Sequence, residues 1–256
     1  MRRNWTEDEL LIALGLYCKL PFGKFHQHTP LIQQAAEQMD RTPSSVAMKL
    51  SNLASLDPVI TESGRRGLPS ASALDKKMWG EFSSNATHWM PIIEERLDQL
   101  LGTPPASMDR KDTKDKATDY SAEDVTTTST RRKGQNLFRE AVLSAYNSRC
   151  CLTGVAEPRL LIASHIKPWS ADATNRLNPH NGLCLSALVD RAFDKGLITF
   201  SEDYRLVISP LLSSQRNNEH IHETFYKRKG EQLALPEKFT PNQDFLAWHR
   251  EKIFLL

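Results

Sequence analysis

The stretch NPHNGLCLSALVDRAFDKGLITF, residues 178–200, carries the signals of a strand that leads directly into a helix. The Asn-Gly dipeptide at 181–182 is a typical turn, and the apolar residues 183–185 that follow are typical of a short buried strand. Ser186 can cap the N-terminus of a helix, and Gly196 is a residue at which helices commonly end. The stretch therefore predicts a strand, a helix of two to three turns and a stop.

An apolar run ahead of it, LLIASHIKPWS at residues 160–170, ends in a histidine that is soon followed by proline and tryptophan. The turn dipeptides Thr153-Gly154 and Glu157-Pro158 predict a β-hairpin over 150–165 whose second strand places His165 at its end. With the helix that follows, this makes a small ββα unit. A histidine held at a strand end can act as a base, or it can be a hydrogen-bonded structural residue, and the strand alone leaves both open.

The predicted helix carries two carboxylates, Asp190 and Asp194, four residues apart. Side chains at this spacing project from the same face of a helix, so the pair could bind one hard divalent cation through oxygen atoms. A solvated acidic edge is the alternative. The metal interpretation is favoured because His165, Asn181 and the aspartate pair all fall within one compact unit.

Three motifs of this unit resemble the HNH endonuclease family. They are ASHIKPW at 163–169, NPHNGLCL at 178–185 and LVDRAFDKGLITF at 188–200. The resemblance implies an α+β protein with a ββα-metal nuclease domain and a divalent cofactor, Mg²⁺ or Mn²⁺. It also implies hydrolysis of phosphodiester bonds in DNA.

The resemblance also implies a role for each motif residue. His165 would deprotonate the attacking water, and Asn181 would fix the catalytic loop. Asp190 and Asp194 would hold the ion, which stabilises charge on the scissile phosphate and the leaving oxygen, with Ser164 as a third ligand position. Many family members have Asp or His at the position of Ser164, and histidine at the position of Asp190.

The segment at 102–130 is rich in charged and small polar residues and has almost no aliphatic ones, so it is predicted to be a flexible linker. It divides the chain into a DNA-recognition domain at 1–101 and a nuclease domain at 131–256. Residues 1–100 carry 11 basic and 12 acidic side chains, whereas residues 131–256 carry 18 and 13. The excess positive charge that attracts phosphate therefore lies in the predicted nuclease domain.

The first domain is predicted to be mainly helical and to contain a helix-turn-helix or winged-helix-like unit. Threonine followed by proline, at 29–30 and at 42–43, is typical of a helix start, and the short turn at 39–41 separates two such helices. The second helix would enter a DNA groove. The predicted DNA contacts are Ser44, Ser45, Lys49 and Asn52 on the outer face of that helix, and Lys167 beside the predicted base. Arg65 and Arg66, in a loop between two glycines, are further predicted contacts if the loop is a wing, and the alternative is a plain surface turn.

Residues 20–30 and 41–58 also resemble an N-terminal domain that is often joined to this nuclease type in bacterial restriction proteins. Some similar two-domain proteins cut double-stranded DNA that contains methylated or hydroxymethylated cytosine. The resemblance therefore implies a restriction enzyme of this modification-dependent kind. Two alternatives are an HNH endonuclease that cuts an unmodified site, and a non-catalytic DNA-binding regulator whose HNH domain is degenerate.

Composition sets the remaining expectations. No apolar run is long enough to cross a bilayer, and the N-terminus lacks the apolar stretch of a signal peptide, so a cytoplasmic protein without a membrane partner is expected. The four cysteines form no C-x-x-C motif and are expected to be buried free thiols. Because one HNH unit usually nicks one strand, a double-strand cut would require a homodimer or two sequential events.

Overall fold

The computed structural model describes residues 3–62, 64, 68, 70–102 and 127–256, with side chains from 134 onward in the last range. The first part of the chain contains α1 (Glu7–Lys19), η1 (Phe22–Lys24), α2 (Pro30–Gln38), α3 (Pro43–Ala54), α4 (Pro58–Glu62), α5 (Ala73–Ser84) and α6 (Ala86–Leu101). The second part begins with α7 (Thr127–Ala145), η2 (Pro158–Leu160), β1 (Leu161–His165), η3 (Pro179–Asn181), β2 (Gly182–Ser186) and α8 (Ala187–Asp194). It ends with β3 (Ile198–Phe200), β4 (Leu206–Ile208), η4 (Pro210–Gln215), α9 (Glu219–Thr224), η5 (Tyr226–Arg228) and α10 (Gln243–Lys252).

The helices of the first part begin where the sequence places their caps. Thr6 and Glu9 form a capping box, in which each side chain accepts a hydrogen bond from the other residue's backbone N–H. Thr42 accepts a hydrogen bond from the backbone of Ser45 at the start of α3. Helix α2 begins directly after Thr29, although the Thr29 side chain makes no cap hydrogen bond. The mainly helical N-terminal region is therefore confirmed.

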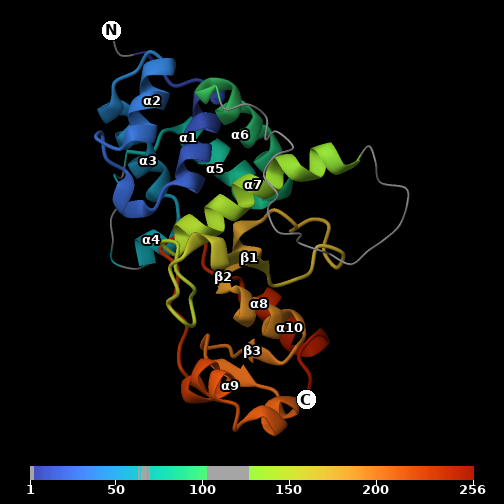
Figure 1. Ribbon diagram of the computed structural model, residues 1–256. Coiled ribbons are helices and arrows are strands. Elements are labelled where there is room, and N and C mark those ends of the chain that lie inside the picture. Colours follow the sequence, from blue (N-terminus) through green and yellow to red (C-terminus); the bar gives the residue numbers. More distant parts are fainter. Residues whose placement is uncertain (1–2, 63, 65–67, 69, 103–126) are drawn as a thin grey trace.

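Helix α7 lies between the N-terminal helices and the β1–β2 sheet (Figure 1). It packs against α1 and α6 on one side and against β1 and β2 on the other. The buried apolar residues of α7 are Leu137, Phe138, Ala141, Val142 and Ala145. They belong to the same buried cluster as the N-terminal helices, so the two predicted domains share a packed surface. Most of the predicted linker, residues 103–126, lies outside the described residues, and the division into domains remains a prediction.

A buried lysine also joins the two parts of the chain. The Lys238 side chain is fully buried, and its Nζ donates to the carbonyl oxygens of Tyr17 at 2.5 Å and Leu20 at 2.8 Å. Its Nζ also lies 3.2 Å from Ser144 Oγ on α7. These carbonyls end α1, where a helix favours positive charge. Burial lowers the pKa of Lys238 to about 8. A residue close to the end of the chain thus caps its first helix.

The unit around residues 178–200 has the predicted order of strand and helix. Strands β1 and β2 are antiparallel, with Leu161 opposite Ser186 and His165 opposite Gly182. Helix α8 follows β2 directly and ends before Gly196, whose φ of 66° is the left-handed conformation that glycine favours. Ser186 precedes α8 but makes no side-chain cap hydrogen bond.

The predicted hairpin over 150–165 is wrong, because β1 pairs with β2. Pro158 lacks a backbone N–H and begins the 3-10 helix η2, so the segment ahead of β1 is not a strand. Antiparallel β3 and β4 form a second small sheet. Helices with two small sheets confirm the predicted α+β class and the ββα order.

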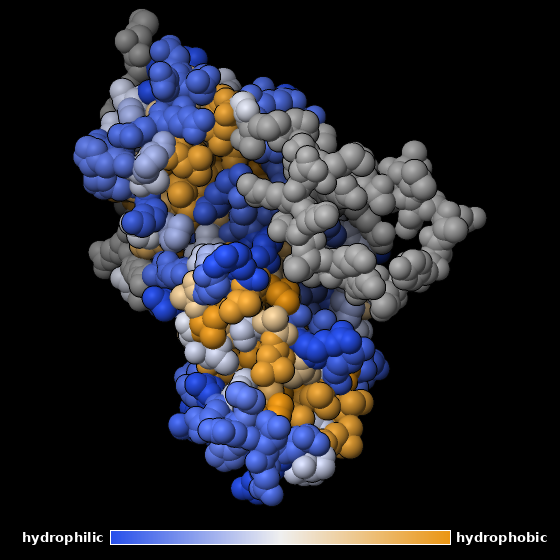
Figure 2. Space-filling view, viewed as in Figure 1, coloured by the Kyte–Doolittle hydropathy of each residue, from blue (hydrophilic) through white to orange (hydrophobic). Residues whose placement is uncertain are grey.

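Two further expectations concern burial. All four cysteines are buried and form no disulfide. Across the described ranges, no helix combines the length and apolar character needed to span a membrane. On the face seen in Figure 2, the surface over the N-terminal helices is mostly hydrophilic.

Candidate active site

The β1–β2 sheet packs closely against α7 at a glycine of β2. His165 is the last residue of β1, and its partner in β2 is Gly182. A Cβ atom at Gly182 would lie 2.3 Å from Cγ2 of Val142 and 3.2 Å from Cζ of Phe138, both on α7. Any side chain at 182 would therefore push β2 away from α7. The glycine of the Asn-Gly dipeptide is required for packing, and this packing sets the position of His165.

The His165 ring is held on two sides. It stacks on Phe138 with ring centroids 4.5 Å apart and planes 7° from parallel, and it meets the Trp169 ring nearly at right angles with centroids 5.8 Å apart. Its Nε2 lies 2.8 Å from the carbonyl oxygen of Arg176. A carbonyl can only accept, so Nε2 carries the proton and donates it. In the neutral imidazole the basic lone pair is then on Nδ1. The half-buried His165 therefore has a fixed ring plane and a fixed tautomer.

Asn181 connects the two ends of the loop that follows His165. Its side chain is fully buried, and Oδ1 accepts from the backbone N–H of Lys167 at 2.8 Å. Its Nδ2 donates to the carbonyl oxygens of Lys167 at 3.1 Å and Asn175 at 3.2 Å. These hydrogen bonds satisfy the buried amide and fix the backbone two residues after His165.

The loop is closed further by Asp172. Its carboxylate accepts from the backbone and side-chain nitrogens of Asn175, and it forms an ion pair with Lys167 at 3.0 Å. Although burial raises the pKa of Asp172, hydrogen bonds from Asn175 and Lys167 lower it overall. The Lys167 Nζ also lies over the Phe245 ring at 5.3 Å. Lys167, a predicted DNA contact, is thus paired within the loop.

The predicted metal ligands lie on β1 and α8. Asp190 is half-buried and Asp194 is exposed, one helical turn apart. Ser164 is only 2% exposed, and its Oγ has no hydrogen-bond partner among the described residues. Successive side chains of a strand point to opposite faces, so Ser164 and His165 lie on opposite faces of β1. The sheet itself lies between α7 and α8 (Figure 1).

This unit coincides with a family match. Residues 150–201 match the family model described as HNH endonuclease. They contain β1, β2, α8 and the whole loop between β1 and β2. Among solved structures, the "Modification dependent TagI restriction endonuclease" is similar at 17% identity and a TM-score of 0.33. That similarity covers 45% of this chain and 37% of the other. No curated protein matches the chain.

Domains of the HNH family generally use a divalent ion, and the donors present have the right chemistry for one. In the described part of the chain, no three His, Cys, Asp or Glu side chains form a group that could hold a metal. Mg²⁺ commonly takes one or two protein carboxylates and completes its shell with water and substrate phosphate. Asp190 and Asp194 supply carboxylate oxygens of this kind, and the buried Ser164 hydroxyl has no hydrogen-bond partner among the described residues. The ligand set remains a prediction.

The predicted DNA contacts of α3 divide into exposed and buried residues. Ser44 is exposed and Ser45 is half-buried. The prediction that Lys49 and Asn52 face outward is wrong, because they are only 5% and 7% exposed. Helix α5 covers that face, and Lys49 Nζ lies 2.7 Å from the Oδ1 of Asp75 on α5. Arg65 and Arg66 lie outside the described residues.

The sequence did not indicate the groups that hold His165. Phe138 has the signal of a buried helix residue, which says nothing about what stacks on it. Arg176 acts through its carbonyl oxygen, which every residue has, so no motif could mark it. The Arg176 side chain itself donates to the carbonyl of Trp169 at 2.7 Å and thereby braces the same loop of the HNH domain.

Proposed function

We propose that the protein is a metal-dependent DNA endonuclease in which His165 is the general base. The observation that carries this proposal is the fixed tautomer of His165 inside an HNH domain. Its Nε2–H is bound to the Arg176 carbonyl, so Nδ1 is the nitrogen that accepts a proton. A fixed ring plane and a fixed tautomer are what a general base at the end of β1 requires.

The residues around His165 perform three tasks in this mechanism. Nδ1 takes the proton from the water that attacks the phosphodiester, while Phe138 and the Arg176 carbonyl keep the ring in one plane. Asn181 keeps the following loop closed. Asp190, Asp194 and Ser164 would hold a divalent ion, Mg²⁺ or Mn²⁺. When bound, the ion supplies stabilisation of the charge on the phosphate and the leaving oxygen.

The substrate that we propose is double-stranded DNA. The 18 basic and 13 acidic residues in 131–256 give this region the charge that attracts phosphate. Helices α2 and α3 would read the site as a helix-turn-helix, through the exposed Ser44 and its half-buried neighbour Ser45. A homodimer would allow both strands to be cut. The cytoplasmic location expected from the sequence agrees with this substrate.

Within this function, we further propose that the target is DNA with 5-methylcytosine or 5-hydroxymethylcytosine. This choice is supported by the N-terminal motifs at 20–30 and 41–58, which resemble the domains joined to HNH nucleases in restriction proteins. An endonuclease for an unmodified site and a non-catalytic regulator are the alternatives. One cleavage assay distinguishes each of these alternatives from the proposed function.

The test uses three plasmids of the same sequence, with unmodified, 5-methylated and 5-hydroxymethylated cytosine. Each is incubated with the full chain and Mg²⁺, Mn²⁺ or EDTA. We expect nicks or breaks only in modified DNA and only with metal. Equal cutting of all plasmids would refute the modification preference. Binding without cutting under every condition would support the regulator and refute the nuclease.

The metal ligands have their own assay. Asp190→Asn and Asp194→Asn each remove a charge from the proposed site, so the Mg²⁺ concentration for half-maximal cleavage should rise. Asp203→Asn is the matched control, because Asp203 is an exposed carboxylate outside α8. If the two α8 variants behaved like the control, these carboxylates would be a solvated surface only.

A further inference from the structure

One peptide group joins the HNH loop to the N-terminal helices. The peptide between Arg176 and Leu177 has its carbonyl oxygen bound to His165 Nε2 at 2.8 Å. The N–H of the same peptide donates to Thr87 Oγ1 at 3.1 Å. Thr87 lies in the first turn of α6, far from the HNH domain in sequence. Both ends of the peptide dipole are therefore bonded, one to the proposed base and one to α6.

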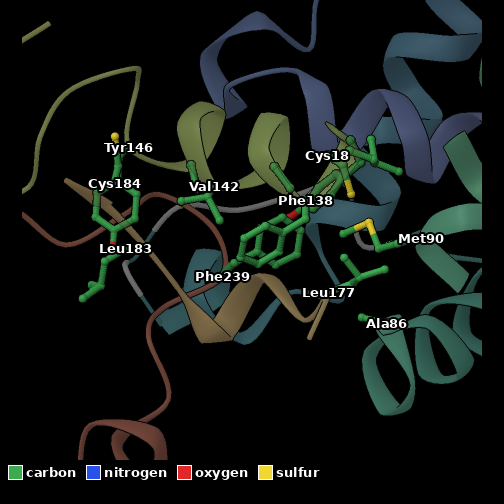
Figure 3. Packing of buried hydrophobic residues seen from close by; sticks show 14 of the residues in the cluster. Cys18, Ala86, Met90, Phe138, Val142, Tyr146, Leu177, Leu183, Cys184 and Phe239 are labelled. Carbon is green, nitrogen blue, oxygen red and sulfur yellow. The ribbon is translucent and has the colours of Figure 1, made fainter. Parts of the chain in front are cut away.

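The packing of the Leu177 side chain brings this peptide close to α6. Leu177 is 5% exposed, and Figure 3 shows it beside Phe138, with Met90 and Ala86 of α6 nearby. A Cβ atom at Gly134 of α7 would lie only 2.2 Å from the Leu177 Cδ1. The Leu177 side chain thus lies in a site formed by α6 and α7, which brings the 176–177 peptide next to Thr87 of α6.

We propose that Thr87 is a positioning residue for His165. Thr87 holds the N–H end of the 176–177 peptide, which aims the carbonyl end at Nε2 and so selects the tautomer with its lone pair on Nδ1. Two hydrogen bonds through one peptide also polarise each other in the same sense. The proposal rests on His165 being the base, and it makes α6 of the N-terminal region part of the nuclease machinery.

Loss of the Thr87 hydroxyl leaves the Leu177 N–H without its acceptor. The peptide can then turn, and the His165 ring loses its fixed partner. Small displacements of a reacting group reduce rates by up to about a hundredfold. We therefore expect a fall in cleavage of about 10- to 100-fold with little change in DNA affinity, because Thr87 does not lie among the proposed DNA contacts.

The test compares Thr87→Val, which keeps the shape and removes the acceptor, with Thr87→Ser, which keeps the hydroxyl. Thr61→Val is the control at an exposed threonine on α4. Cleavage is measured on the full chain. The ring ¹⁵N chemical shifts of His165, recorded without DNA, report which nitrogen carries the proton. We expect Thr87→Val to cut slowly and to show mixed tautomers, and Thr87→Ser to restore both properties.

The outcomes separate this inference from the proposed function. Thr87→Val with the wild-type rate and a pure Nε2–H tautomer would overturn the positioning role. A slow variant with an unchanged tautomer would mean that Thr87 acts only on the packing, which also overturns it. If Thr87→Val does not fold, Thr87→Ala gives the same reading with less bulk. His165→Ala, measured in parallel, tests the base itself, and the tautomer measurement stands without any cleavage.

Discussion

The C-terminal half contains two histidines that both stack on phenylalanine, yet their surroundings differ. His165 is half-buried, and its Nε2 is bonded to the carbonyl of Arg176. His249 on α10 is 1% exposed, its Nδ1 lies 2.9 Å from Thr199 Oγ1, and its Nε2 lies 3.1 Å from the Phe193 carbonyl. Its ring also lies flat on Phe193, 3.7 Å between centroids.

The difference separates the proposed catalytic histidine from a structural one. At His249 both ring nitrogens are used inside the core, and burial lowers its pKa to about 4, although the hydrogen bond to Phe193 acts in the opposite direction. It is therefore neutral at physiological pH and shielded from any substrate. At His165 the Nε2 is bonded to the Arg176 carbonyl, and the residue is only half-buried. Both rings stack on a phenylalanine, and their different exposure and hydrogen bonding distinguish them.

The different roles of the two histidines are tested most directly by replacing each in turn. His165→Ala should reduce cleavage by a factor of about 10² to 10⁴, the usual loss when a general base is removed, while the fold and DNA affinity persist. His249→Gln should keep cleavage near the wild-type rate at temperatures where it is folded. The measurements are single-turnover cleavage, circular dichroism and DNA binding. Normal cutting by His165→Ala would remove the base assignment.

Lys49 extends the comparison to a second buried polar group. It pairs with Asp75, which is 0% exposed, through distances of 2.7 Å and 2.9 Å. Lys49→Ala leaves the Asp75 carboxylate buried without its cation, so the free energy of unfolding should fall by about 3 to 5 kcal/mol. Denaturant titration measures this fall. Lys77→Ala, at an exposed lysine paired with Glu7, should leave the free energy of unfolding almost unchanged.

The opposite outcome for Lys49 is equally clear. If Lys49→Ala were as stable as Lys77→Ala and bound DNA more weakly, Lys49 would face DNA as the spacing on α3 predicts. That prediction failed for a physical reason. Helical spacing identifies the face opposite Leu50 and Leu53, but a second helix can cover that face. Helix α5 begins some twenty positions later, and the sequence of α3 does not predict that α5 packs on it.

The HNH unit shows which parts of a site a sequence contains. The positions of β2, α8 and the strand before His165 follow from apolar runs, turn residues and caps, which act within a few residues. The β1 partner was missed because pairing is a long-range choice, and a proline excluded the nearer candidate. The hold on His165 was also missed, because it runs through the Arg176 carbonyl and through Thr87, which lies in another part of the sequence.

The pH dependence of stability tests the structural role of His249. An unfolded histidine has a pKa of 6.5, and folded His249 has a pKa of about 4. Between these values the unfolded chain binds a proton that the folded chain does not, so stability falls as pH falls. The complete loss is about 3 kcal/mol, reached below pH 4.

This loss is measured as the free energy of unfolding of the wild type and of His249→Gln from pH 7 to pH 4. The variant lacks the titrating group, so its disadvantage against the wild type should shrink as the pH is lowered. His165→Ala provides the matched histidine deletion at a half-buried position. If the wild type and His249→Gln lost stability in parallel, the proton would be binding elsewhere and His249 would not be the structural counterpart of His165.

The smallest effect is expected at Ser44, which tests whether α3 keeps any outward function once Lys49 and Asn52 are buried. Ser44 is exposed on α3, and its Oγ lies 3.1 Å from Thr42 Oγ1. Ser44→Ala removes one neutral hydrogen-bonding group, so affinity for the preferred DNA should fall about fivefold, the equivalent of about 1 kcal/mol. Affinity for other DNA and the free energy of unfolding should stay unchanged. Ser84→Ala, at an exposed serine of α5, is the control.

An equal loss on every DNA would make Ser44 a phosphate contact, because phosphate contacts position a protein without reading sequence. No loss at all would leave α3 as a supporting helix and would move the selection of DNA to another surface.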